Sequence, residues 1–147
     1  MSLLSQTAEY ALRAVLWLAS QPDQPMTVQA IAKGTQVPAG YLSKVLQTLG
    51  RAGLVRSQRG LGGGFILTRS PAQLSALEVI NAVDPLKRIH ECPLKLRQHK
   101  KKLCPLHRRL DDAVAEMERS FGEVTIGDLL GEGELTPLGA KRPSSKR

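Results

Sequence analysis

Apolar residues near the start of the chain recur every three or four positions, which is the spacing of an amphipathic helix. One such stripe covers residues 4–19, with Glu9 and Arg13 on its polar side. Prolines interrupt the pattern at residues 21–25, and Thr27 then offers a favoured N-cap for a second, shorter helix. The pattern therefore predicts two helices joined by a proline-containing turn.

A third helical stripe follows, and after it the period changes. Five apolar side chains share one face of the helix predicted at residues 39–51: Tyr41, Leu42, Val45, Leu46 and Leu49. Gly53 ends this helix, and extended segments at residues 54–57 and 65–68 flank a glycine-rich turn at residues 60–64. Such a pattern predicts a β-hairpin. Three helices followed by a hairpin are the order of a winged helix-turn-helix, so we expect a mainly α fold of that class.

Short helices are also predicted in the second half of the chain. Ser75 and Glu78 have the spacing of a capping box, which opens a helix that runs to Ala82. Three side chains of this helix are expected to face inward: Leu77, Ile80 and Val83. Thr125 and Asp128 begin a last short helix in the same way.

A long helix is predicted to start at Cys104 and Pro105, since proline is favoured at the first helical position. Its apolar stripe consists of Leu106, Leu110, Val114, Met117 and Phe121. No partner for this stripe is evident within the same domain, which favours a homodimer interface. The expected organisation is a winged helix-turn-helix region at 1–84, a Cys/His sensing loop at 85–104, dimerisation and terminal helices at 105–131, and a basic disordered tail at 132–147.

The composition narrows the function. The chain has 147 residues, a formal net charge of +8 and only 3% aromatic residues. The positive charge favours a polyanionic partner, and the scarcity of aromatic residues argues against a stacking platform for single strands, so double-stranded DNA fits best. The longest apolar run, residues 14–19, is too short to cross a bilayer, and Glu9 and Arg13 interrupt any signal-peptide-like segment. We therefore expect a cytoplasmic protein with no membrane partner.

The helix at residues 39–51 is the second helix of the helix-turn-helix, so its outward side chains are expected to meet base edges in the major groove. Lys44 can donate to guanine, and Gln47 can pair with adenine. Arg56 and Arg59 flank the hairpin turn, where they can enter the minor groove or contact phosphates. The predicted DNA-binding residues are Thr27, Tyr41, Ser43, Lys44, Gln47, Thr48, Arg51, Arg56, Arg59, Gly62 and Gly63.

The loop before the long helix contains four possible metal ligands. They are Cys92, His99, Cys104 and His107, at C-x6-H-x4-C-x2-H spacing. Thiolate and imidazole are ligands of both zinc and iron–sulfur clusters. Cys104 and His107 are three residues apart at a helix start, so they are expected to share a face. Three interpretations stay open: a bound metal or cluster, a Cys92–Cys104 pair that closes to a disulfide on oxidation, and an inert basic surface.

Several segments resemble a known family. They are AEYALRAVLWLA at residues 8–19, GLVRSQRGLGGGF at 53–65, LSALEVINAVD at 74–84 and TIGDLL at 125–130. Together they resemble the Rrf-type winged-helix regulators, the group that includes IscR, NsrR and CymR. The resemblance implies a homodimeric bacterial transcription factor, usually a repressor, that binds a palindromic operator. It also implies that the long C-terminal helix crosses to the partner and that the loop before it receives the signal.

The resemblance also bears on the cofactor. Cluster-binding members of the family commonly carry three cysteines in this loop, and two of them match Cys92 and Cys104, whereas the middle one is missing here. A three-cysteine site is therefore excluded, and a cluster would need His99, His107 or a carboxylate. Glu9 falls where some members supply an acidic ligand from the partner subunit. This mixed donor set implies a 2Fe–2S cluster or zinc as the candidate cofactor.

Two other classes of function remain open at this stage. One is a nucleic-acid-binding architectural protein without sequence preference, which the charge allows. The other is an enzyme that uses the thiols or a metal in the loop. The chain contains no C-x-x-C, H-E-x-x-H or P-loop motif, so the sequence favours no enzyme mechanism. A regulator differs from an architectural protein by its preference for one DNA site at constant salt.

Overall fold

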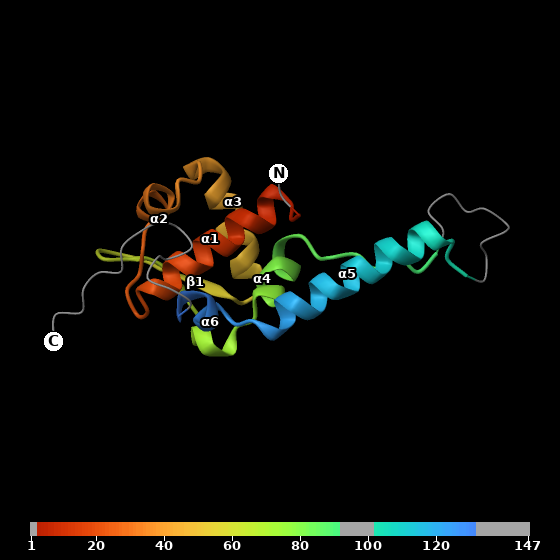
Figure 1. Cartoon of the computed structure of the whole chain (residues 1–147). Helices are drawn as coiled ribbons and strands as arrows, with labels where there is room; N and C mark the ends of the chain where they lie inside the picture. The colour runs from red at the N-terminus through yellow and green to blue at the C-terminus, as the bar shows by residue number, and fades with distance from the viewer. Residues whose placement is uncertain (1–2, 92–101, 132–147) are drawn as a thin grey trace.

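Four helices form the body of the molecule. The computed structural model describes residues 3–91 and 102–131. Helices α1 (Gln6–Ser20), α2 (Val28–Thr35), α3 (Ala39–Arg51) and α4 (Ala76–Val83) pack against one another (Figure 1). The first helix begins two residues later than the sequence pattern suggests, because the Ser5 side chain accepts a hydrogen bond from the amide of Ala8 and is the N-cap.

A two-stranded hairpin follows α3. Strands β1 (Val55–Gln58) and β2 (Gly64–Leu67) are antiparallel, with Val55 opposite Leu67 and Gln58 opposite Gly64. Met26 and Phe65 exchange backbone hydrogen bonds of 3.0 and 2.7 Å, which ties the hairpin to the residue before the α2 cap. The predicted hairpin is confirmed, although both strands lie within one residue of their expected bounds. A short 3-10 helix, η1 (Pro71–Gln73), leads on to α4.

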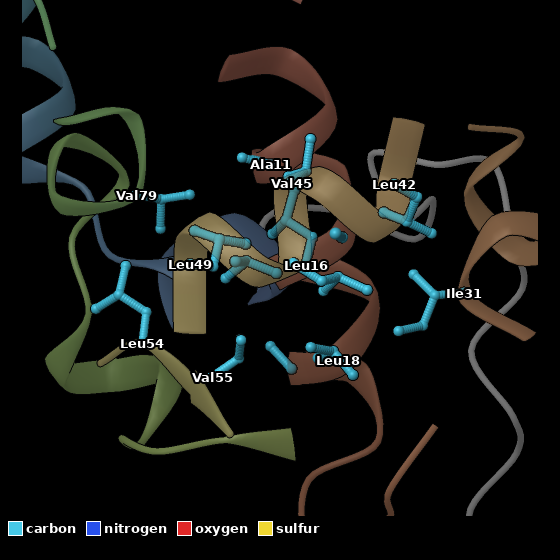
Figure 2. Packing of buried hydrophobic residues seen from close by; sticks show 14 of the residues in the cluster. Ala11, Leu16, Leu18, Ile31, Leu42, Val45, Leu49, Leu54, Val55 and Val79 are labelled. Atoms are coloured by element: carbon cyan, nitrogen blue, oxygen red, sulfur yellow. The ribbon is translucent and has the colours of Figure 1, made fainter. Parts of the chain in front are cut away.

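The core lies between these elements. Buried side chains from α1, α2, α3, the start of β1 and α4 point toward one another (Figure 2). Leu42, Leu46 and Leu49 of α3 are completely buried, which confirms most of the predicted stripe. Residues four or three apart fall on one side of a helix, so a single face of α3 can fill the core while the other faces solvent.

The inward face of α4 differs from the prediction. Ala76, Val79 and Ile80 are buried, whereas Leu77 and Val83 are only half-buried. The reason is that α4 contacts both the core and α5, and Leu77 lies on the side toward Gly122 of α5. The predicted Ser75–Glu78 capping box is present.

Helix α5 (Pro105–Glu123) begins away from the body and runs back to it, so that most of its length projects from the body (Figure 1). None of its 19 residues is buried. Its last turns pack on α4, and α6 (Ile126–Gly131) then returns to the core through the fully buried Ile126. The expectation that α5 has no partner in its own domain is therefore wrong for its C-terminal end. Within residues 3–91 and 102–131, no helix is long and apolar enough to cross a membrane.

Candidate nucleic-acid interface and sensing residues

The solvent face of α3 carries the residues predicted to read bases. Because Leu42 and Leu46 are buried, Lys44 and Gln47 are turned outward and are exposed. Ser43 and Thr48 are half-buried, and the Thr48 hydroxyl donates to the carbonyl oxygen of Lys44 at 3.1 Å. Lys44 and Gln47 therefore have the exposure that a base contact requires, while Thr48 also makes a bond within its own helix.

Tyr41 lies at the edge of the α3 stripe rather than within the core. Its side chain is 37% exposed, and its hydroxyl lies 2.5 Å from that of Thr7. Its ring meets the ring of Tyr10 edge-on, with 5.2 Å between centroids. Tyr41 thus connects α3 to α1, and its contact with DNA stays a prediction. Thr27 is exposed, and its side chain caps α2 by accepting from the amide of Ala30.

Exposed basic side chains continue from α3 into the hairpin. Arg51, at the end of α3, and Arg56 and Arg59, along the hairpin, are all exposed. The amide of Leu54 donates to the carbonyl oxygen of Leu49 at 3.0 Å, so the turn between helix and strand is fixed. The predicted tip glycines, Gly62 and Gly63, lie in the turn between the strands. One continuous unit, α3 followed by the hairpin, therefore presents Lys44 and these three arginines.

A network on α1 was missed by the sequence analysis. The Arg13 guanidinium forms an ion pair with Glu9 at 2.7 Å and lies 5.7 Å from the centre of the Tyr10 ring. It also donates to the carbonyl oxygen of Thr35, near the end of α2, at 3.5 Å. The four-residue spacing of Glu9 and Arg13 could have indicated the ion pair. Its link to α2 depends on how the two helices pack, which the spacing does not give.

Cys104 and His107 come together at the start of α5. The Cys104 thiol is the N-cap and accepts from the amide of His107, and its Sγ lies 3.1 Å from Nδ1 of the same histidine. Pro105 occupies the first helical position, as predicted. Both side chains are half-buried. A thiolate and an imidazole held this close are a matched pair of soft and borderline ligands for zinc or iron.

Of the other proposed ligands, only Glu9 lies within the described residues, and it is not close to this pair. Cys92 and His99 lie outside the described residues. Glu9 belongs to α1 in the body, whereas Cys104 precedes α5 at its far end (Figure 1). Among residues 3–91 and 102–131, no three His, Cys, Asp or Glu side chains are placed to hold a metal ion. Within one protomer, two of the three candidates that the structure describes therefore come together.

The chain segment after α4 is clamped to the middle of α5. Both carboxylate oxygens of Asp111 accept from Arg88, with Nε–Oδ1 and Nη2–Oδ2 distances of 2.7 Å. The amide of Ile89 donates to Oδ1 at 2.8 Å. These three hydrogen bonds stabilise the ionised carboxylate, so the pKa of Asp111 is held far below its usual range, chiefly by Arg88. We call this group the Asp111 clamp.

The apolar stripe of α5 divides into two parts. Leu106 is 62% exposed and Leu110 is 47% exposed, while Val114, Met117 and Phe121 are half-buried. The half-buried part lies toward the end that packs on α4. The exposed part lies near the Cys104–His107 pair and has no cover in the described part of the chain.

Comparison with known proteins identifies the family. A family model described as Rrf2, iron-dependent transcriptional regulator, matches residues 4–132. This chain belongs to the Rrf2 family. An rrf2-like protein of Rhodobacter capsulatus, named as an HTH-type transcriptional regulator, is 30% identical over 98% of this chain and 97% of its own. A protein of Aquifex aeolicus, also named as an HTH-type transcriptional regulator, is 29% identical over 92% of this chain and 98% of its own.

Solved structures agree with this assignment at the level of the fold. CymR of B. subtilis has a TM-score of 0.75 at 24% identity and covers 90% of this chain and 99% of its own. IscR of T. potens has a TM-score of 0.73 at 23% identity, covering 89% and 88%. The mainly α winged-helix fold is therefore confirmed. Members of the Rrf2 family are transcriptional regulators that bind DNA and are not enzymes, which rules out the enzyme alternative.

Proposed function

We propose that this Rrf2-family regulator is a homodimeric, sequence-specific repressor of a palindromic operator. In this proposal α3 enters the major groove and the hairpin contacts the neighbouring minor groove. The observation that carries it is the pair of exposed side chains on α3, Lys44 and Gln47, followed along the chain by the exposed arginines of the hairpin. Bidentate or paired contacts of this kind discriminate between bases, while the arginines add affinity.

The dimer is proposed to form through α5. Its exposed leucines, Leu106 and Leu110, offer an apolar face near the start of the helix.

DNA reading is tested by selecting a duplex from a random library with the wild-type protein. Lys44→Ala and Gln47→Ala should each lose about 1–3 kcal/mol of discrimination at individual base pairs. Lys87→Ala is the matched control, because Lys87 is exposed and lies in the segment after α4. It should leave the preference for the selected site intact. An equal loss of affinity for selected and random duplexes in the α3 variants would refute a base-reading role.

We further propose that the start of α5 receives the signal. Cys104 and His107 supply a thiolate and an imidazole, so the donors present fit zinc or a 2Fe–2S cluster. A complete site would need further ligands. The candidates are Cys92 and His99 of the same chain, together with Glu9 of the partner subunit. Glu9 would have to leave its ion pair with Arg13 to serve. A bound group would join the loop to the dimer helix, where a change in its state can alter operator affinity.

The Asp111 clamp supports this proposal by its position. It fixes Ile89 beside Asp111, seven residues after Cys104. The clamp therefore holds the described segment that precedes Cys92 about 10 Å along α5 from Cys104, because seven residues of helix rise about that far. This position supports the proposal that Cys92 and Cys104 act together, whether they bind one metal or form a disulfide. A solved structure of S. aureus CymR is described as an oxidised form, which keeps the thiol interpretation beside the metal one.

The two interpretations are separated by the visible spectrum and by iron, sulfide and zinc analysis of protein purified without oxygen. A visible band with iron and sulfide supports the cluster, and stoichiometric zinc without colour supports a zinc site. A metal-free protein that forms a reversible Cys92–Cys104 disulfide supports the thiol switch. Cys104→Ala should abolish whichever signal is found. Unchanged operator binding after loading, removal and oxidation in the wild type would refute sensing at this site.

A further inference from the structure

The tip of the hairpin is a tight turn with a leucine at its apex. The amide of Gly63 donates to the carbonyl oxygen of Gly60 at 3.0 Å, which closes a turn over Leu61 and Gly62. Gly60 and Gly62 have backbone φ angles of 100° and 72°, which residues other than glycine rarely adopt. A Cβ at Gly63 would lie 2.4 Å from the carbonyl oxygen of Gln58. The turn is thus specified by its glycines, and the only side chain at its apex is that of Leu61.

Leu61 is the most exposed large apolar residue of the described chain. Its relative accessibility is 108%, so it makes no contact that shields it from water. Scattered exposed leucines are ordinary. This one is held outward because it lies at the apex of a closed turn whose conformation is fixed by the glycines on either side. The hairpin also carries the exposed Arg56 and Arg59. An apolar side chain two residues after Arg59, in a turn otherwise formed by glycines, has the chemistry of a group that meets DNA.

We infer that Leu61 is an apolar wedge that enters the minor groove and packs against sugars or between bases at a flexible step. The inference rests on the proposed DNA binding and adds a specificity-determining residue to it. The minor groove is about 6 Å wide. The glycines beside Leu61 add no side chains to the tip, so the leucine can approach the groove without obstruction from its neighbours. Leucine is among the side chains that DNA-bending proteins insert between base pairs.

This contact has a consequence for DNA sequence. Pyrimidine–purine steps unstack more easily than others, so a wedge favours them without any hydrogen bond to a base. The flank of the operator reached by the hairpin should therefore prefer a TA or CA step. Arg59, by contrast, responds to groove width and charge. The two tip residues should thus have separable effects on sequence preference.

The test uses the full chain and the duplex that the wild type selects from a random library. Leu61→Ala and Leu61→Ser should bind it about tenfold more weakly, because several buried carbon atoms are lost. Leu61→Met keeps an apolar side chain of similar size and should retain wild-type affinity. Replacing the flanking TA step by AA should weaken the wild type and leave Leu61→Ala unaffected. Thermal unfolding of all three variants should match the wild type, because Leu61 is outside the core.

A second readout reports the wedge directly. A 2-aminopurine base at the flanking step should brighten when the wild type or Leu61→Met binds and should stay dim with Leu61→Ala. Arg59→Ala separates the failures. If Arg59→Ala weakens operator binding while Leu61→Ser binds like the wild type, the wedge is refuted and the regulator stands. If the wild type selects no duplex, the proposed function itself has failed.

Discussion

The body of the molecule and helix α5 differ in how their apolar residues are covered. In the body, side chains from four helices and the hairpin enclose one another, and several leucines are completely buried. In α5, a longer helix than any in the body, no residue is buried, and Leu106 and Leu110 are turned to solvent. Burial of apolar surface is the main source of folding free energy. The body therefore buries its apolar residues within one protomer, with Ile126 of α6 among them, whereas the exposed part of the α5 stripe needs a second surface to be buried.

The two regions are nevertheless joined at defined points. The amide of Ala76 donates to the carbonyl oxygen of Val124, and the amide of Ile126 donates to that of Leu74. These bonds fasten the C-terminal end of α5 beside the start of α4. The Asp111 clamp holds the middle of α5 to the segment after α4. Helix α5 is thus attached at two points, its C-terminal end and Asp111. Its start, with Cys104 and His107, extends beyond both points.

The largest effect is expected from a cavity in the body. Leu46 is completely buried within the core cluster. Leu46→Ala should lower the free energy of unfolding by about 2–5 kcal/mol, because transfer energy and packing are lost together. Chemical denaturation followed by circular dichroism measures this. Leu61→Ala removes the same atoms at a site that is fully exposed and is the matched control. Equal destabilisation by the two variants would contradict the location of the core.

The next effect should appear in assembly rather than in folding. Leu110→Glu places a charge on the exposed part of the α5 stripe. We expect the dimer dissociation constant to rise by about a hundredfold, since apolar burial is lost and a charge is desolvated. Analytical ultracentrifugation measures it, while the unfolding of the monomer should change little.

The control for this variant lies on the opposite side of the same helix. Arg108→Gln changes the net charge by the same amount at an exposed position two residues away, which is turned by roughly 200° around the axis. It should leave the dimer unchanged. If Arg108→Gln dissociates the dimer and Leu110→Glu does not, the interface lies on the other face of α5.

A smaller effect is expected where α4 begins. The Ser75 hydroxyl accepts from the amide of Glu78, and the Glu78 carboxylate accepts from the amide of Ser75. Ser75→Ala should lower the free energy of unfolding by about 1 kcal/mol, the usual loss of an N-cap. Thermal unfolding measures this loss. Ser57→Ala is the control, because Ser57 is exposed on the hairpin and caps no helix. A Ser75→Ala variant as stable as the wild type would show that the cap contributes little.

Sequence patterns predicted the body better than they predicted α5. Local rules decide where Ser75 caps a helix and where Leu42 and Leu49 face the core, and these expectations are confirmed. The pairing of Arg88 with Asp111 was missed, because the two residues are 23 positions apart and nothing local relates them. The split of the α5 stripe was missed for a similar reason. The split depends on where α4 covers α5. The same contact explains Leu77, which the helical pattern assigns to the core and which instead lies beside Gly122 of α5.

In the candidate sites, too, contacts within one helix were predicted and contacts between helices were not. Helical spacing was enough to place Lys44 and Gln47 on the exposed side of α3 and to pair Cys104 with His107. The network of Arg13 with Glu9 and Thr35 joins two helices, and only its four-residue ion pair has a local signal. Contacts within one element are thus readable from a single sequence. Contacts between elements require the packing that the sequence specifies only as a whole.

The smallest effect concerns the Asp111 clamp and is local. Asp111→Ala removes the acceptor of three hydrogen bonds, so the amide of Ile89 should exchange with solvent severalfold faster. Asp111→Asn keeps one acceptor and should fall between. Asp112→Ala, at the exposed neighbouring carboxylate, is the control. Hydrogen exchange followed by mass spectrometry over residues 84–91 measures the change. Equal protection in Asp111→Ala and the wild type would show that the segment is held by something else.

The clamp should also have a defined response to acid. The pKa of Asp111 is lowered in the folded state, first by Arg88 and then by the amide of Ile89. A carboxylate of this kind contributes stability above its unfolded pKa of about 4 and loses it only as pH falls through the lower folded value. Protection of the Ile89 amide, corrected for intrinsic exchange, should therefore be the same at pH 5 and pH 8. A decline already between pH 6 and pH 5 would point to a histidine rather than to Asp111, because only a histidine has an ordinary pKa in that range.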